Sequence, residues 1–327
     1  ERGRERRGKA WGVKPMGGGS TQYISRCRLP SAHEDGLWCV AWSSTGQILT
    51  GSADELVHSF MLYDERFEKK AVLSGHSLGV TSLSLCSSGS TAASSGLDAC
   101  IYIWQLDKSD QRLVIQAGPH EAWGVAISPD GRTVAAGSLI GSVNLWSATS
   151  GEKLGALEAG GKLVMCVAYS PDGQLIACGS EDGVVYVFDA TSHSLSAKLN
   201  GHTASIRSIA FSHDSSMLVT GSEDTRSMVW QVSEARLLGT LQGHSSWVLG
   251  AEFSPDDTQA ITCSSDHSLR VWDVSKCLCV QTINDAHTDQ VWGVSFDPNS
   301  SRFCSVSEDR SIRVFEPVPA SSKAAAA

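Results

Sequence analysis

Residues 264–274, with the sequence SSDHSLRVWDV, bring hydroxyl groups, an acid and a histidine together within eleven residues. Asp266 and His267 are adjacent, Trp272 follows, and a second histidine, His244, lies upstream. A histidine near a carboxylate and a hydroxyl is a set of groups that acid–base and nucleophilic catalysis use. A catalytic set occurs once in a chain, so its recurrence elsewhere in the sequence decides between catalysis and structure.

The set does recur, because the chain repeats with a period of 42 or 43 residues. One column of large apolar residues marks the period, at Trp42, Leu85, Ile127, Tyr169, Phe211, Phe253 and Phe296. Nine residues earlier lies a second column, the histidine column, at His33, His76, Gly118, Gly160, His202, His244 and His287. The sequence therefore contains seven units.

A histidine, an aspartate and a tryptophan recur together in the second, fifth and sixth units. These trios are His76, Asp98 and Trp104; His202, Asp224 and Trp230; and His244, Asp266 and Trp272. Their repetition indicates a structural role, and no catalytic or metal-binding residue is predicted. His267 and His58 lie outside the column, and we expect them at the surface.

Each unit contains short runs of alternating or β-branched residues, such as VLGAEF, QAITCS, LRVWDV and CVQTI, separated by Gly, Ser, Asp and Pro. They predict four antiparallel strands per unit. Such a sheet cannot bury both faces alone, so the units stack around an axis as the blades of a propeller. The prediction is an all-β, seven-bladed propeller over residues 21–317. The seventh unit is short of a strand, and residues 22–29 are expected to supply it and remove two exposed edges.

The composition limits the partners of this fold. The first fourteen residues carry six Lys or Arg against two Glu, so the rest of the chain is acidic within a total net charge of -9. An acidic body disfavours direct binding to nucleic acid or to an anionic membrane. Residues 1–20 are predicted to be a disordered basic leader and residues 318–327 a disordered tail.

The ten cysteines show neither CxxC pairs nor a disulfide framework. Most lie in strand-like runs, where a free thiol behaves as a small buried hydrophobe. Reduced thiols fit a location in the cytoplasm and nucleus. No cofactor is expected.

The GH openings, SPDG turns and VWD ending of the units resemble WD repeats over residues 22–316. The resemblance implies that each trio, with a strand hydroxyl, forms a buried hydrogen-bond network that locks its blade. It also implies that function resides on the top face, where the inner strands begin around the central channel.

Strand alternation predicts which residues reach that rim. If the residue four after the histidine column packs between blades, those three and five after it point to the rim, including small residues such as Gly36 and Gly79. In WD repeats a third rim position precedes the turn aspartate. The predicted partner-binding residues are Trp38, Leu97, Glu121, Trp123, Leu139, Leu163, Met165, Glu181, Arg207, Glu223, Trp247, Leu249, Trp292 and Glu308.

Large apolar groups exposed together are typical of interaction sites, and tryptophans are common anchors in them. Glu121, Glu181, Glu223 and Glu308 form an acidic arc beside the aromatic residues. A partner segment with an arginine and a nearby hydrophobic residue would match both features.

Stretches such as AHEDGLWCVAW, AASSGLDACIYIW and GHSSWVLGAEFSPDDT resemble the family of WD-repeat subunits of the superkiller complex, which also serve in the polymerase-associated factor complex. The resemblance implies a non-catalytic adaptor in exosome-linked mRNA decay and transcription elongation. It implies a monomeric propeller within a hetero-complex, whose top face binds helical-repeat, tetratricopeptide-type scaffold proteins. The family's partner motif is a Gln-Arg pair followed by a hydrophobic residue.

Three other functions remain open. A substrate receptor for a ubiquitin ligase favours an arginine two residues after the WD dipeptide, where Ser275 and Thr191 stand. An enzyme with its site in the channel lacks a histidine–nucleophile pair at the rim. A scaffold of another fixed assembly, such as a ciliary or trafficking complex, would use the same surface.

Overall fold

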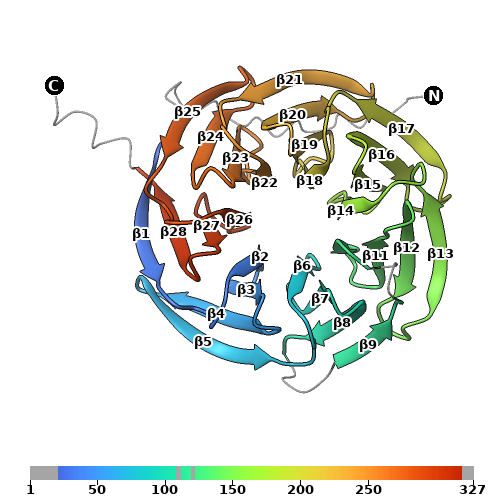
Figure 1. The fold of residues 1–327 in the computed structure, drawn as a ribbon, viewed down its shortest axis with the longest axis horizontal. Helices are drawn as coiled ribbons and strands as arrows, with labels where there is room; N and C mark the ends of the chain where they lie inside the picture. Colours follow the sequence, from blue (N-terminus) through green and yellow to red (C-terminus); the bar gives the residue numbers. More distant parts are fainter. Residues whose placement is uncertain (1–20, 108–111, 119–121, 319–327) are drawn as a thin grey trace, which may run out of the picture.

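Seven four-stranded antiparallel sheets form a closed ring in the computed structural model, which describes residues 21–107, 112–118 and 122–318 (Figure 1). Each sheet is one blade, and within the described residues every regular element is a strand. The all-β, seven-bladed propeller predicted from the sequence is confirmed. The predicted leader, residues 1–20, and residues 319–327 of the predicted tail lie outside the described residues.

The four strands of each blade run from the channel to the outside of the ring. From blade 1 to blade 7, the inner strands are β2 (Leu37–Trp42), β6 (Val80–Leu85), β10 (Val125–Ile127), β14 (Val164–Tyr169), β18 (Ile206–Phe211), β22 (Val248–Phe253) and β26 (Val291–Phe296). The second strands are β3 (Gln47–Ser52), β7 (Thr91–Gly96), β11 (Thr133–Gly137), β15 (Leu175–Ser180), β19 (Met217–Ser222), β23 (Gln259–Ser264) and β27 (Phe303–Ser307).

The outer half of each blade has the same order. The third strands are β4 (Val57–Tyr63), β8 (Cys100–Gln105), β12 (Ser142–Ser147), β16 (Val184–Asp189), β20 (Arg226–Gln231), β24 (Leu269–Asp273) and β28 (Ile312–Pro317). The outer strands are β5 (Arg66–Leu73), β9 (Arg112–Gln116), β13 (Lys153–Glu158), β17 (Leu195–Asn200), β21 (Arg236–Gln242), β25 (Leu278–Ile283) and β1 (Tyr23–Leu29).

Strand β1 closes the ring, as the sequence predicted. It pairs antiparallel with β28, so the first strand of the chain completes the last blade (Figure 1). Tyr23 packs edge-on against Phe303 with the ring centroids 4.9 Å apart, and its hydroxyl lies 3.2 Å from Gln259 of blade 6. The N-terminal strand therefore ties blades 6 and 7 together.

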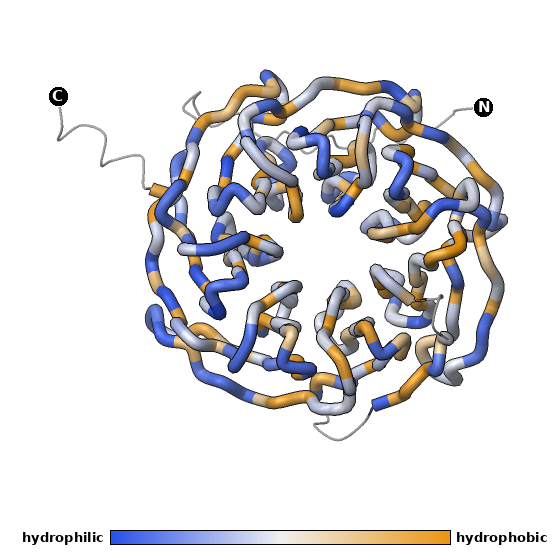
Figure 2. Tube along the Cα trace, in the orientation of Figure 1, coloured by the Kyte–Doolittle hydropathy of each residue, from blue (hydrophilic) through white to orange (hydrophobic). Residues whose placement is uncertain are grey.

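The hydrophobic core lies between neighbouring blades. Leu37, Trp42 and Phe60 of blade 1, for example, pack with Val306 and Val314 of blade 7. Hydrophilic and hydrophobic residues alternate along many strands, because successive side chains point to opposite faces (Figure 2). Each blade buries its apolar faces only against its neighbours, so the ring closes as a unit. No helix in the described residues has the length and apolar character needed to cross a membrane.

Candidate functional site

A chain of hydrogen bonds crosses blade 2 at its top. Nδ1 of His76 lies 3.0 Å from the carboxylate of Asp98, and Nε2 lies 2.8 Å from the hydroxyl of Ser94. The indole N–H of Trp104 donates to the same hydroxyl at 2.9 Å. Burial lowers the pKa of His76, so we assign a neutral ring that donates from Nδ1 and accepts at Nε2.

The same chain of contacts recurs in the other two trios. In blade 5, Asp224, His202, Thr220 and Trp230 lie in series, with contacts of 2.8, 2.7 and 3.0 Å. In blade 6, Asp266, His244, Thr262 and Trp272 do the same, with contacts of 2.9, 2.7 and 2.8 Å. The side chains that opened the question of catalysis are therefore engaged with one another inside the blades.

Blades 1 and 7 hold a shorter version that the sequence analysis missed. His33 contacts Asp54 and Thr50, and a phenylalanine replaces the tryptophan. His287 contacts Asp309 and Ser305 in the same way. The available signal was a hydroxyl residue 17 or 18 positions after the column histidine.

Blades 3 and 4 depart from this pattern in different ways. In blade 3, Ala136 stands where Ser94 stands in blade 2, and the buried indole N–H of Trp146 has no hydrogen-bond partner. In blade 4, the column residue is a glycine, Cys178 replaces the hydroxyl, and Phe188 replaces the tryptophan. Losing the indole together with its acceptor leaves nothing unsatisfied, whereas losing the acceptor and keeping the indole leaves a buried donor unpaired.

His58 is buried, so the expectation that it lies at the surface is wrong. Its ring stacks on His33 with the centroids 3.8 Å apart, and its Nδ1 lies 3.0 Å from the carbonyl of Ala32. Sequence spacing from the column gave no sign of this stacking, because His58 is on the third strand. His267 is exposed, as expected.

The residues four positions after the histidine column are all buried between blades, which was the assumption behind the rim prediction. They are Leu37, Val80, Ala122, Val164, Ile206, Val248 and Val291. In six of the seven blades the strand register then shifts by one residue, which places a β-bulge at the next position. The bulged residues are Trp38, Thr81, Met165, Arg207, Leu249 and Trp292. Bulges commonly redirect side chains next to functional sites, and here all six bulged residues line the channel.

Two rim tryptophans share one carboxylate between blades 7 and 1. The indole N–H of Trp38 donates to Oε2 of Glu308 at 3.1 Å, and that of Trp292 donates to the same oxygen at 2.8 Å. The two rings lie 6.5 Å apart between centroids. This part of the rim is held in one arrangement before any partner arrives.

Two glycines make that arrangement possible. A Cβ at Gly79 would collide with the ring of Trp38, and a Cβ at Gly36 would lie 2.6 Å from the carboxylate of Glu308. Trp38 therefore packs sideways over blade 2. The sequence placed both glycines at the rim but gave no reason for them.

A second preformed cluster lies on blades 5 and 6. Arg207 forms an ion pair with Glu223 through its Nε, at 2.6 Å, and through its Nη2. The guanidinium carbon lies 5.6 Å from the centre of the Trp247 ring. Trp247 remains 46% exposed.

The other predicted rim residues divide into exposed and recessed groups. Leu97 and Leu139 are exposed, while Trp123 and Leu163 are half-buried. Met165 and Leu249 are only 9% and 7% exposed, so the expectation that they would be exposed with the tryptophans is wrong. They are buried residues of the channel lining instead. Glu121 lies outside the described residues.

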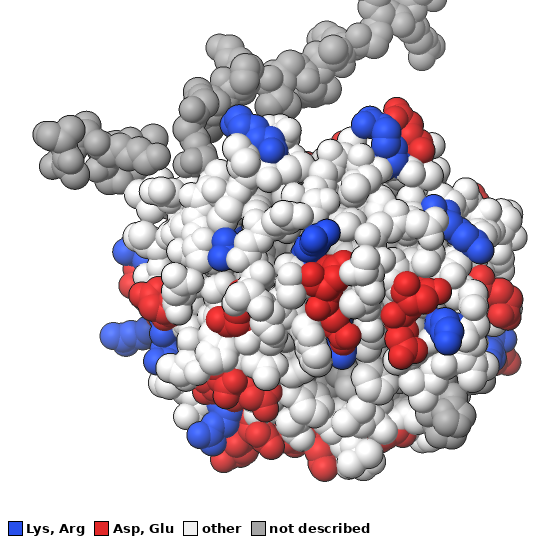
Figure 3. Space-filling model, turned by 45° about the horizontal axis from the view of Figure 1, so that its top comes forward, with Lys and Arg blue, Asp and Glu red and all other residues white. Residues whose placement is uncertain are grey.

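The acidic arc is less available than the sequence indicated. Glu223 and Glu308 are engaged with rim residues, whereas Glu181 is exposed and its carboxylate has no hydrogen bond or ion pair among the described residues. On the face shown in Figure 3, acidic side chains form several separate groups, with basic side chains beside most of them. Glu181 is the described rim carboxylate best placed to meet a basic partner group.

The channel behind the rim has a volume of about 840 Å³ and is lined by the inner strands of the blades. One ring of wall residues lies eight positions after the histidine column: Ala41, Ser84, Ala126, Ala168, Ala210, Glu252 and Ser295. Six are small, and Glu252 is the exception. The pKa of Glu252 is raised to about 8, and burial of the carboxyl group is the largest cause. Glu252 was not among the residues predicted from the sequence, although an alignment of the seven units at this position would have revealed it as the one large side chain.

The closed ring of seven four-stranded blades around a channel defines a β-propeller. The family model "WD domain, G-beta repeat" matches residues 25–60, 67–105, 151–189, 193–231, 235–273 and 277–316. The chain belongs to the WD40 repeat family. The unmatched segment between residues 105 and 151 contains the first three strands of blade 3, β10 to β12, and in this blade the hydrogen-bond chain is broken.

Three curated relatives share part of the chain. The WD repeat-containing protein SL1-17 of Schistosoma mansoni is 33% identical over 112 residues, which is 33% of this chain and 37% of that protein. The WD repeat-containing protein VIP3 of Arabidopsis thaliana is 35% identical over 106 residues, or 31% and 32%. Superkiller complex protein 8 of Dictyostelium discoideum is 32% identical over 94 residues, or 28% and 31%. The chain spans about a third of the length of each relative in these alignments.

Proposed function

We propose that this chain is a non-catalytic interaction subunit of a superkiller-type complex and of a polymerase-associated factor complex. Its top face binds tetratricopeptide-type scaffold proteins, and it acts in both the cytoplasm and the nucleus. The fold supports the role as a protein-interaction subunit, because WD40 propellers are protein-interaction scaffolds. The similarity to superkiller complex protein 8 supports the choice of complex.

The observation that carries the proposal is the mixed chemistry of the rim. Trp247, Leu97 and Leu139 expose apolar surface, and the exposed carboxylate of Glu181 has no partner among the described residues. An extended partner segment with an arginine and a hydrophobic residue, such as the Gln-Arg motif, matches these groups. The bulged strands and the Glu308 cluster hold the rim rigid, which lowers the entropic cost of binding.

Affinity purification with the tetratricopeptide scaffold of the superkiller complex tests this function. We expect Trp247→Ala and Trp123→Ala to weaken binding at least tenfold, about 1.4 kcal/mol or more, because tryptophan anchors dominate interface energies. Leu195→Ala, an exposed residue on outer strand β17, is the control and should bind as the unaltered protein does. Full binding by both tryptophan variants would exclude the top face as the docking surface.

A further inference from the structure

Glu252 accepts a hydrogen bond that links two blades, and this hydrogen bond does not require a charged side chain. Its Oε2 accepts the backbone N–H of Phe296 in the next blade at 2.9 Å. At the equivalent position, Ser84 accepts from Ile127 at 3.0 Å, and Ser295 accepts from Trp42 at 3.1 Å. A serine hydroxyl can therefore accept this inter-blade hydrogen bond in place of a carboxylate. Burying an ionisable group costs free energy, so its presence here calls for another role.

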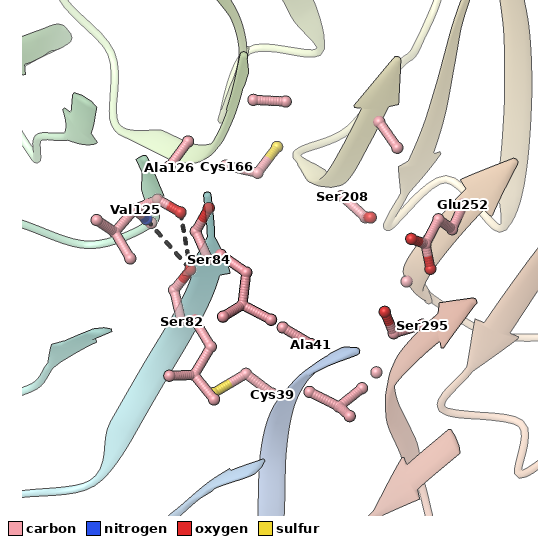
Figure 4. Close-up of a pocket in the computed structure, with 18 of the residues that line it drawn as sticks. Cys39, Ala41, Ser82, Ser84, Val125, Ala126, Cys166, Ser208, Glu252 and Ser295 are labelled. Atoms are coloured by element: carbon pink, nitrogen blue, oxygen red, sulfur yellow. Dashed lines mark hydrogen bonds between the residues drawn. The ribbon is translucent and has the colours of Figure 1, made fainter. Parts of the chain in front are cut away.

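Two hydroxyl groups lie beside this carboxyl group. Ser295 hydrogen-bonds to the carboxyl of Glu252 through its side chain, and Figure 4 shows Ser208 and Ser295 on the channel side of Glu252, with all three residues lining the channel. Ser208 accepts the backbone N–H of Ala251 at 3.0 Å, and Ser295 accepts that of Trp42. Each hydroxyl oxygen has a second lone pair, so blades 5, 6 and 7 each offer an acceptor to the same channel.

We propose that Glu252, Ser208 and Ser295 form a binding site for an alkylammonium group inside the channel. An ammonium has three N–H donors, which match the three acceptors in number. A metal ion fits less well, because a hard cation needs several oxygen ligands and the described residues contain no cluster of three His, Cys, Asp or Glu.

The wall of the channel restricts the shape of the ligand. The wall around Glu252 combines small residues, such as Ala251 and Gly293, with branched apolar residues, such as Val294, so the part of the ligand behind its ammonium group should be a slim, apolar chain. At the mouth, the rings of Trp38, Trp123 and Trp292 favour cations over anions through their π-faces. The ligand is a primary amine on a linear carbon chain, which a free polyamine or a lysine of a partner protein supplies.

Binding at this site is linked to proton release. Glu252 is largely protonated at pH 7, so the carboxyl O–H bond breaks when the ammonium arrives and the proton passes to the buffer. Of the other groups that face the carboxyl, Ser208 and Ser295 do not titrate, and the thiol of Cys304 on β27 has its pKa raised by burial and by Glu252. Among the described residues that line the channel, Arg207 is the other charged one, and it is paired with Glu223.

Isothermal titration calorimetry of the full chain with n-pentylammonium chloride tests the site. We expect saturable binding with release of nearly one proton per ligand, measured in buffers of different ionisation enthalpy. Affinity should rise about tenfold per pH unit below pH 8, because only the ionised fraction binds. Glu252→Gln should abolish binding and still fold, since its side-chain carbonyl can accept the N–H of Phe296.

A matched control and two ligands complete the experiment. Ser84→Ala removes an equivalent inter-blade acceptor away from the site and should leave amine binding unchanged. A Gly-Gly-Lys-Gly-Gly peptide that binds as well as the amine would assign a partner lysine, whereas binding of the amine alone would assign a free amine. Equal binding by a folded Glu252→Gln variant, or no saturable binding at pH 9, would overturn the site.

Discussion

At the scale of single residues, the free-energy cost of a buried polar atom depends on whether it has a hydrogen-bond partner. Trp104 and Trp146 occupy equivalent positions, but the first donates to Ser94 and the second faces Ala136. An unpaired buried donor costs about 1–3 kcal/mol. Blade 3 is therefore less stable than its packing indicates.

Ala136→Ser should repair this defect. The new hydroxyl would stand where Ser94 stands and accept the N–H of Trp146, raising the free energy of unfolding by about 1 kcal/mol in urea denaturation. Cys178→Ser is the matched control, because it places a hydroxyl at the same position in blade 4, where the histidine and the indole are both absent. That variant should be destabilised, and equal effects of the two substitutions would contradict the explanation.

A second prediction at this scale concerns the glycine beneath Trp38. Gly79→Ala should displace the ring and break its hydrogen bond to Glu308, which costs about 1–3 kcal/mol of stability and weakens scaffold binding. Tryptophan fluorescence and the affinity assay measure the two effects. Gly155→Ala, where the nearest neighbouring atom is 4.0 Å from the new Cβ, serves as the control. Unchanged fluorescence in Gly79→Ala would mean that Trp38 is not held there.

At the scale of strands and blades, the histidines give the fold its dependence on pH. Burial lowers the pKa of His33 to about 4, with His58 contributing, and lowers those of His58, His76, His202 and His287. The unfolded chain therefore binds more protons below pH 6.5. The stability that these neutral rings provide is complete above pH 6.5 and is lost as the pH falls toward about 4.

His58→Tyr should reduce that loss of stability. In blade 2 the equivalent residue is Tyr102, whose hydroxyl donates to the carbonyl of Gly75 as Nδ1 of His58 donates to that of Ala32. The variant removes one titrating ring and the repulsion it exerts on protonated His33. Urea denaturation at pH 7, 6 and 5 should show a shallower decline than in the unaltered protein. A decline of the same steepness would show that the stacked pair does not control it.

At the scale of the whole molecule, stability depends on closing the ring, because every core layer lies between two blades. Strand β1 is the last piece, since it pairs with β28 and anchors Tyr23 between blades 6 and 7. Strand β1 covers the edge of β28 that would otherwise be unpaired. Weakening β1 should therefore destabilise the ring as one cooperative unit.

Tyr23→Ala tests this closure. Removing the 3%-exposed ring should lower the free energy of unfolding by about 3 kcal/mol in a single transition. Ile24→Ala changes the neighbouring residue, whose side chain is 47% exposed, and should change stability by less than about 0.5 kcal/mol. Thermal unfolding of both variants gives the comparison. A separate early transition in Tyr23→Ala would indicate that the last blade opens independently.

The sequence by itself determined the repeat, the number of blades, the closing strand and the hydrogen-bond trios. The repeat, the blades and the residues of the trios follow from a local pattern that recurs every 42 or 43 residues, such as alternation along a strand or the distance from His76 to Asp98. The closing strand follows from the strand missing in the seventh unit, and the hydrogen bonding of the trios from the resemblance to WD repeats. Because the pattern occurs in seven units, a departure in one unit does not hide it. The architecture could therefore be predicted without any knowledge of contacts. Attention to the common pattern also left Glu252 and His58 unnoticed as exceptions, because they differ from their counterparts in the other blades.

Only the tertiary structure decided how the rim and the channel are arranged. The β-bulges shift the strand register just where Trp38, Arg207 and Trp292 reach the mouth, and simple alternation does not predict them. The shared carboxylate of Glu308 joins residues 270 positions apart in the chain, and Ser208, Glu252 and Ser295 come from three blades. These contacts exist only because the ring closes, and closure brings together side chains that no local spacing relates.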